Sequence, residues 1–159
     1  MTNKADEHRR LILDQFTKQA VPFSQMQNHS PELLLNASGV GPEEIVLDVA
    51  CGPGLMACAF AKVARHVTGI DLTPAMIEQA KVLQASDGLA NLTWQIGDVN
   101  PLPFPDTVFS LVFTRYSFHH FLDPKAVLAE MDRVCSPGGR VVVVDVFMSN
   151  RIRPRRTTA

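Results

Sequence analysis

The sequence of 159 residues predicts an α/β fold, in which helices cover both faces of a mostly parallel sheet. The first observation is that short apolar segments alternate with segments of helical periodicity along most of the chain. The second is that these apolar segments are nearly continuous, which is typical of strands buried on both sides. Gly and Pro residues mark the places where one kind of segment gives way to the next. Together these features predict a doubly wound domain.

The N-terminal part of the chain is predicted to be helical. Apolar residues recur at helical spacing among charges over residues 6–19, which predicts an amphipathic helix that ends at the Val-Pro-Phe sequence of residues 21–23. A Ser-Pro pair is typical of a helix start, so a second, short helix is expected over residues 31–37, closed near Gly39.

Strands and helices then alternate from residue 45 onward. The expected strands are residues 45–49, 67–70, 92–96, 109–113 and 141–144. The expected helices are residues 55–64, 74–85 and 124–135. A Pro-Gly-Gly sequence at 137–139 is predicted to separate the last helix from the last strand, and a Pro-rich loop occupies residues 101–105.

Composition fits one globular domain, because 46% of the residues are hydrophobic and 19% are charged. Within it we expect an N-terminal helical cap at residues 1–41 and a ligand-binding core at residues 42–148. Residues 149–159 form a basic tail whose arginines are expected to be solvated.

Several classes of protein are disfavoured. A formal net charge of -1 gives no electrostatic case for nucleic acid. No segment approaches the roughly 20 apolar residues of a membrane span, and the N-terminus lacks the apolar stretch of a signal peptide. Three cysteines without ligand-like spacing argue against a disulfide framework or a zinc site. We therefore expect a cytoplasmic protein without a metal ion.

A Gly-Pro-Gly turn follows the first predicted strand and indicates a nucleotide-type cofactor. Asp48 lies just before this turn, and Gly52 and Gly54 let a ligand approach the backbone without meeting a Cβ atom. Together with Ala57 and the later Asp71, these glycines also satisfy the dinucleotide fingerprint. A nicotinamide or flavin enzyme is therefore one candidate.

Asp48 favours a cationic cofactor over a dinucleotide. A carboxylate at this position would repel a pyrophosphate, whereas it would attract the ammonium and sulfonium groups of S-adenosylmethionine, directly or through water. Asp71, at the end of the second strand, would accept hydrogen bonds from both ribose hydroxyls. Asp98, after the third strand, would accept one from the adenine amino group. Acids at three successive strand ends thus match a cation-bearing nucleoside.

Four ordered motifs resemble those of class I S-adenosylmethionine-dependent methyltransferases, in particular the small-molecule branch related to ubiquinone and menaquinone biosynthesis enzymes. The motifs are VLDVACGPG at 46–54, GIDLTPAM at 69–76, GD at 97–98 followed by LPF at 102–104, and PGGR at 137–140. The resemblance covers residues 45–147. It implies a Rossmann-like sheet and the cofactor S-adenosylmethionine, which leaves as S-adenosylhomocysteine.

The resemblance also implies roles for single residues in the cofactor site. The methionine part would be flanked by Gly52, Gly54 and the backbone near Thr114. The ribose would be bound by Asp71, and the adenine would contact Leu72, Met76, Asp98 and Val99. Met76 is equally well explained as a residue on the face of its helix that packs in the hydrophobic core.

Candidate catalytic residues follow the fourth and fifth strands. His119 or His120 can serve as a base where the acceptor must lose a proton, although either one can instead only fix the loop by hydrogen bonding. Asp145 interrupts a run of valines, where a buried acid without a partner would be costly. Arg115 either binds an anionic acceptor or faces solvent.

The chain departs from the family pattern after Phe147, where we expect the last two strands of the seven-stranded family sheet to be lacking. The fifth strand would then lie at an open edge, which favours self-association through that edge or coverage by the tail. We expect methyl transfer to a small-molecule acceptor. The alternatives are a non-catalytic cofactor-binding or interaction module and, disfavoured by Asp48, an NAD-type oxidoreductase.

Overall fold

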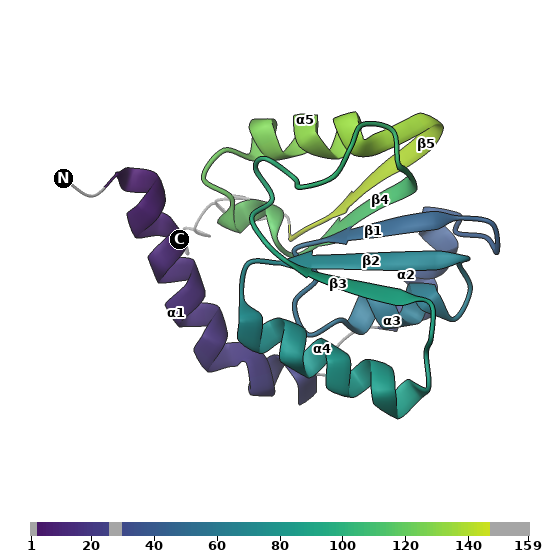
Figure 1. Ribbon diagram of the computed structural model, residues 1–159, viewed down its shortest axis with the longest axis horizontal. Helices are drawn as coiled ribbons and strands as arrows, with labels where there is room; N and C mark the ends of the chain where they lie inside the picture. Colours follow the sequence, from purple (N-terminus) through teal and green to yellow (C-terminus); the bar gives the residue numbers. More distant parts are fainter. Residues whose placement is uncertain (1–2, 26–29, 147–159) are drawn as a thin grey trace, which may run out of the picture.

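A computed structural model of the protein describes residues 3–25 and 30–146. The strands of this part are β1 (Ile45–Val49), β2 (His66–Asp71), β3 (Leu92–Ile96), β4 (Phe109–Arg115) and β5 (Cys135–Val144). They form a five-stranded sheet in the order β3-β2-β1-β4-β5, and every neighbouring pair is parallel (Figure 1). The predicted doubly wound α/β fold is confirmed, with β5 at one edge of the described sheet.

Helices precede the sheet and connect most of its strands. They are α1 (Lys4–Gln25), α2 (Pro31–Ser38), α3 (Leu55–Ala61), α4 (Pro74–Asp87) and α5 (Pro124–Val134), with a 3-10 turn η1 (Phe118–His120). α2 ends as predicted at Gly39, which adopts the left-handed conformation with φ 67°. Within the described residues, no helix is both long and apolar enough to cross a membrane.

Three predicted boundaries were wrong by more than the one or two residues by which others differ. α1 continues through Pro22 to Gln25, because a proline near the end of a helix removes only one backbone donor from the ladder. α3 is shorter than expected and ends at Ala61. The Pro-Gly-Gly sequence lies inside β5 and not before it, because the register with β4 shifts there, and the extra residues bulge out.

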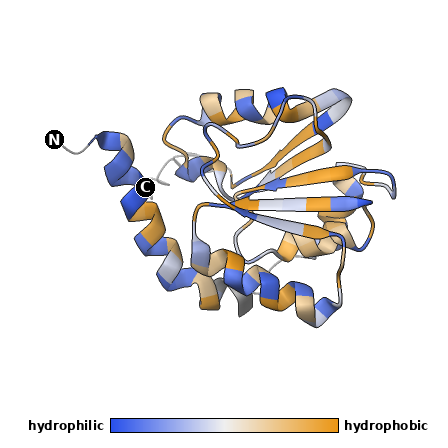
Figure 2. Cartoon of the chain, viewed as in Figure 1, coloured by the Kyte–Doolittle hydropathy of each residue, from blue (hydrophilic) through white to orange (hydrophobic). Residues whose placement is uncertain are grey.

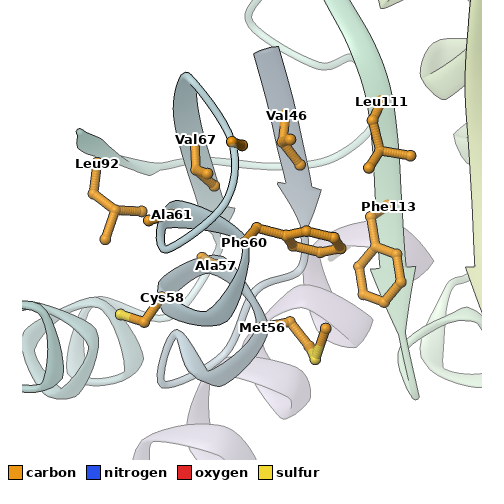
Figure 3. Close-up of a cluster of buried hydrophobic side chains, with 11 residues drawn as sticks. Val46, Met56, Ala57, Cys58, Phe60, Ala61, Val67, Leu92, Leu111 and Phe113 are labelled. Carbon is orange, nitrogen blue, oxygen red and sulfur yellow. The ribbon is translucent and has the colours of Figure 1, made fainter. Parts of the chain in front are cut away.

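Two apolar clusters hold the sheet between its layers. On one face, Phe60 of α3 packs edge-to-face on Phe113 of β4, with 4.9 Å between the ring centroids, inside a cluster built on β1, β2 and β4 (Figure 3). On the other face, Met131 of α5 belongs to a cluster with Leu47 and Val112. In Figure 2 the strands carry hydrophobic stretches, interrupted by paler and hydrophilic residues in β2 and β3, whereas α1 is largely hydrophilic.

The connection between β3 and β4, residues 97–108, contains neither helix nor strand. Its side chains Val99 and Leu102 are nonetheless buried, and they join the cluster on the α5 face. This segment therefore covers the sheet where a crossover helix would otherwise lie. The arginines at 151–156 lie outside the described residues, and the division into cap, core and tail stays a prediction.

Candidate functional site

The predicted cofactor residues Asp48, Asp71 and Asp98 come from or directly follow β1, β2 and β3, at the carboxyl edge of the sheet. Ligands of doubly wound sheets bind at this edge. β1 and β2 are neighbours, which brings the turn after β1 against the end of β2: the Cys51 N–H donates to the Ile70 carbonyl at 3.0 Å.

The two glycines of the turn do different things. Both have positive φ, 54° for Gly52 and 81° for Gly54. A Cβ atom on Gly54 would lie 2.8 Å from both Ala80 and Trp94, so Gly54 is required by packing against α4 and β3. A Cβ on Gly52 would meet no atom within 4 Å. Gly52 therefore borders open space, as a residue beside a ligand must.

Asp48 has a buried carboxylate, one oxygen of which is unpaired among the described residues. The residue is 2% exposed, and Oδ2 has no hydrogen-bond partner in the described part of the chain. Burial raises its pKa from 3.8 to about 7, with nearby Arg115 opposing and Asp71 adding to this shift. A cation next to the turn would supply the missing partner for this carboxylate.

Asp71 holds the turn and the start of α4 together. Its Oδ2 accepts from the Gly52 N–H at 2.8 Å, and its Oδ1 accepts from the Thr73 N–H at 2.9 Å. Burial raises the pKa of this carboxyl despite both hydrogen bonds. Each carboxylate oxygen has a further lone pair, so both can still accept from ribose hydroxyls.

The predicted adenine side is built from the loops after β2 and β3. Asp98 is half-exposed; its Oδ1 accepts from the Val99 N–H at 2.7 Å, and its Oδ2 lies 3.7 Å from Arg9 of α1. Val99 is buried and Leu72 is half-buried. Met76 is only 2% exposed, as expected for a helix residue that faces the hydrophobic core. Its contact with adenine stays a prediction.

Thr114 lies at the centre of the sheet near the same edge. It is fully buried, and its hydroxyl donates to the Val49 carbonyl at 2.8 Å. Its side chain thus ties β4 to β1 beside the turn. The predicted role of its backbone toward the amino-acid end of the cofactor is compatible with this placement.

His119 and Asp145 meet, although the sequence indicated each only as a separate candidate. The His119 Nδ1 lies 2.7 Å from Asp145 Oδ1, and the His119 backbone N–H donates to Oδ2 at 3.0 Å. Burial opposes the charged carboxylate, but hydrogen bonds from Val146 and His119 outweigh it and lower the pKa of Asp145. An ionised Asp145 therefore holds the imidazole with its Nδ1 protonated.

His120 faces α1. Its carbonyl accepts from the His8 Nε2–H at 2.9 Å, and its ring packs edge-to-face on Phe16 with 5.2 Å between centroids. Burial, followed by the neighbouring His119, lowers the pKa of His120. The α1 residues His8 and Arg9 were missed as site residues, because an amphipathic pattern does not say where a helix docks.

The loop after β4 lies against the turn after β1. The Ser117 hydroxyl is 3.4 Å from the Ala50 carbonyl and 3.0 Å from that of Arg115. The Arg115 guanidinium lies over the Tyr116 ring, 5.2 Å from its centroid. The histidine loop is thereby placed next to the glycine turn. Among the described residues, no three His, Cys, Asp or Glu side chains are grouped to hold a metal ion.

Comparison with known proteins gives one consistent result. A family model described as "Methyltransferase domain" matches residues 47–143. The uncharacterized methyltransferase YcgJ of Bacillus subtilis is 34% identical over 115 residues, which cover 72% of this chain and 46% of the relative. The ubiquinone/menaquinone biosynthesis C-methyltransferase UbiE of Desulfotalea psychrophila is 40% identical over 102 residues, covering 63% and 40% respectively. This chain thus spans less than half the length of either relative.

Solved structures show the same fold. The crystal structure of YcgJ matches with a TM-score of 0.71 at 34% identity, over 75% of this chain and 51% of that chain. A crystal structure of a SAM-dependent methyltransferase from Aquifex aeolicus matches with a TM-score of 0.76 over 86% of this chain and 76% of that chain. At 24% identity, the latter likeness concerns the fold.

Proposed function

Because this chain belongs to the methyltransferase domain family, whose cofactor is S-adenosylmethionine, we propose that it transfers a methyl group to a small-molecule acceptor. The cofactor supplies a methyl carbon already activated by its sulfonium. What remains for the protein is to hold this carbon in line with the acceptor atom and, where needed, to remove a proton from the acceptor.

The observation that carries the proposal is the unpaired Oδ2 of buried Asp48, in the strand that leads into the turn where Gly52 borders open space. A carboxylate so placed suits the cationic methionine part of the cofactor and opposes a diphosphate. Asp71, with lone pairs free on both oxygens, suits the ribose. The family match and the relatives named above are methyltransferases, so they give the NAD-type alternative no support.

On the acceptor side we assign the role of base to His119 and that of a positioning residue to Asp145. Asp145 accepts the Nδ1 proton, which leaves Nε2 with a lone pair for a proton of the acceptor. The Ser117 contact to Ala50 keeps this imidazole loop beside the cofactor turn. His120, which packs on α1, is assigned a docking role and not a catalytic one.

Support for a small acceptor comes from the UbiE relative, whose name places it in ubiquinone and menaquinone biosynthesis. The test is a methyl-transfer assay that follows release of S-adenosylhomocysteine against a panel of phenols, carboxylic acids, amines and thiols. We expect turnover with one class. Tight cofactor binding without turnover on any class would instead favour the non-catalytic module.

We further propose that the chain self-associates through β5. In the described chain this strand pairs only with β4, and Val143 on it is 39% exposed. An apolar strand with one unpaired side offers backbone donors and acceptors to another strand. A second copy of the chain would satisfy them.

A further inference from the structure

Two charged side chains of α5, Glu130 and Arg133, hold the 97–108 segment by its backbone. The Leu102 N–H donates to Glu130 Oε2 at 2.8 Å. Arg133 donates from Nη2 to the Leu102 carbonyl at 3.0 Å, and from Nη1 to the Phe104 carbonyl at 2.9 Å. Both polar groups of Leu102 are thus bonded to α5.

The two side chains also lock each other. Arg133 donates from Nε to Glu130 Oε1 at 2.9 Å and from Nη2 to Oε2 at 2.7 Å, while its Nη1 reaches Asp106 at 2.8 Å. The bond from Arg133 is the main cause of a lowered pKa at Glu130. A guanidinium fork bound to both oxygens of a carboxylate has little freedom to rotate, so the carbonyls it binds are fixed in place.

This arrangement matters because the segment has no helix of its own to position it. Backbone groups covered by other atoms need partners, and an irregular segment must find them outside itself. Asp98 and Val99, the residues assigned to the adenine, lie near the start of this segment. Val99 and Leu102 pack in one cluster with Met131 of α5, so α5 holds the segment by both its polar and its apolar side.

We propose that Glu130 and Arg133 are positioning residues for the adenine end of the cofactor site. They fix how closely the 97–108 segment packs on the face of the sheet. The position of the segment in turn sets where Asp98 presents its carboxylate. Without them, Asp98 loses its alignment with the adenine amino group. This inference rests on the role proposed above for Asp98 in the cofactor site.

The test compares two ligands that differ only at the base. S-adenosylhomocysteine has the amino group, and S-inosylhomocysteine has a carbonyl oxygen there, which a carboxylate repels. We expect the wild type to bind the adenine compound at least about tenfold more tightly, because one hydrogen bond to a charged group contributes about that much to affinity. In Arg133→Met the preference should fall toward unity, and in Arg133→Lys and Glu130→Gln it should fall partway, as measured by calorimetric titration.

Arg140 of β5 provides a matched control, because the backbone carbonyls that it binds lie before β1 and not in the 97–108 segment. It donates to the Ser38 carbonyl at 3.0 Å and the Gly39 carbonyl at 3.1 Å, and it pairs with Glu44. Arg140→Met should lower the melting temperature comparably and keep the adenine preference. Glu130→Gln, the mildest change, keeps the test usable where Arg133→Met fails to fold.

The outcomes separate the assignments. A wild-type preference retained in folded Glu130 and Arg133 variants would overturn this inference alone. Equal binding of both compounds by the wild type would overturn it together with the role of Asp98. Because the readout is binding, the absence of turnover in the methyl-transfer assay would leave the result unchanged.

Discussion

His119 and Asp145 are joined by two hydrogen bonds, from the imidazole Nδ1 to Oδ1 at 2.7 Å and from the His119 backbone N–H to Oδ2 at 3.0 Å. One carboxylate therefore orients both the ring and the loop that carries it. The pairing depends on β4 and β5 being parallel neighbours, because their carboxyl ends then lie side by side. The same edge carries Asp48 and Asp71.

If His119 is the base, His119→Gln should reduce turnover about 10²- to 10⁴-fold while leaving the affinity for S-adenosylhomocysteine unchanged. Asp145→Asn should cost less, because the base remains and only its orientation and tautomer suffer. The turnover of both variants is measured as release of S-adenosylhomocysteine with the acceptor found in the panel. His66, which bonds Thr93 at the amino edge, gives the control variant His66→Gln. Full activity of His119→Gln would remove it from the chemistry.

Replacing Asp71 by Ala should weaken binding of S-adenosylhomocysteine roughly 100-fold, because two hydrogen bonds from ribose to a carboxylate are lost. The single tryptophan, Trp94, packs behind the glycine turn, so its fluorescence can follow binding. Asp87→Asn, which breaks an ion pair with Lys62, is the control. Unchanged affinity in a folded Asp71→Ala would exclude a ribose contact.

Asp48 should make the stability of the cofactor-free protein fall as pH rises. Its pKa is raised from 3.8 to about 7, so between these values the native state retains a proton that the unfolded state has released. The stability due to this proton is complete below 3.8 and is lost as pH approaches and passes about 7. Melting temperatures of Asp48→Asn should lack this decline, and the difference between the two proteins isolates it from other groups.

The same carboxyl should link pH to cofactor affinity. A cationic cofactor prefers ionised Asp48, so affinity should increase as pH rises through about 7, and Asp48→Asn should bind more weakly without that increase. Calorimetric titration at pH 6 and pH 8 measures both. Parallel pH profiles for wild type and Asp48→Asn would show that the carboxylate does not meet the cation.

The two turn glycines should respond in opposite ways to alanine. Gly54→Ala places a methyl group 2.8 Å from Ala80 and Trp94 at positive φ, so it should destabilise the fold by about 2–4 kcal/mol. Gly52→Ala should cost only about 1–2 kcal/mol for its positive φ, but should weaken cofactor binding because the methyl group enters the open space. Urea denaturation measures the loss of stability, and calorimetric titration measures the loss of cofactor affinity. If both variants lost affinity in the same proportion to their lost stability, the different roles of the two glycines would be contradicted.

Self-association through β5 should be abolished by a charge on that strand. Val143→Lys introduces a cation on a half-exposed position without changing the sheet order. Sedimentation should show a concentration-dependent dimer for the wild type and a monomer for the variant. Val82→Lys, at an exposed position of α4, is the control. A wild type that stays monomeric at high concentration would refute the proposal.

Local chemistry in the sequence predicted the elements that depend on local interactions. The bounds of β1 and β3 agree with prediction, because a short strand-like segment bounded by turn residues leaves few alternatives. The acid before the Gly-Pro-Gly turn already distinguished a cationic cofactor from a diphosphate. Where neighbouring strand pairing overrode local signals, as at Pro137 within β5, the prediction was wrong.

Tertiary structure alone decided which side chains meet. Nothing near His119 in the sequence indicates that Asp145 is its partner, and nothing near Asp98 indicates that Glu130 and Arg133 hold its segment. These pairs form because the sheet order places distant strand ends and helices side by side, and such contacts are not encoded in any local pattern. The sequence by itself thus determined the fold and the kind of cofactor, whereas the arrangement of strands determined the His119–Asp145 pair and the support of the adenine side.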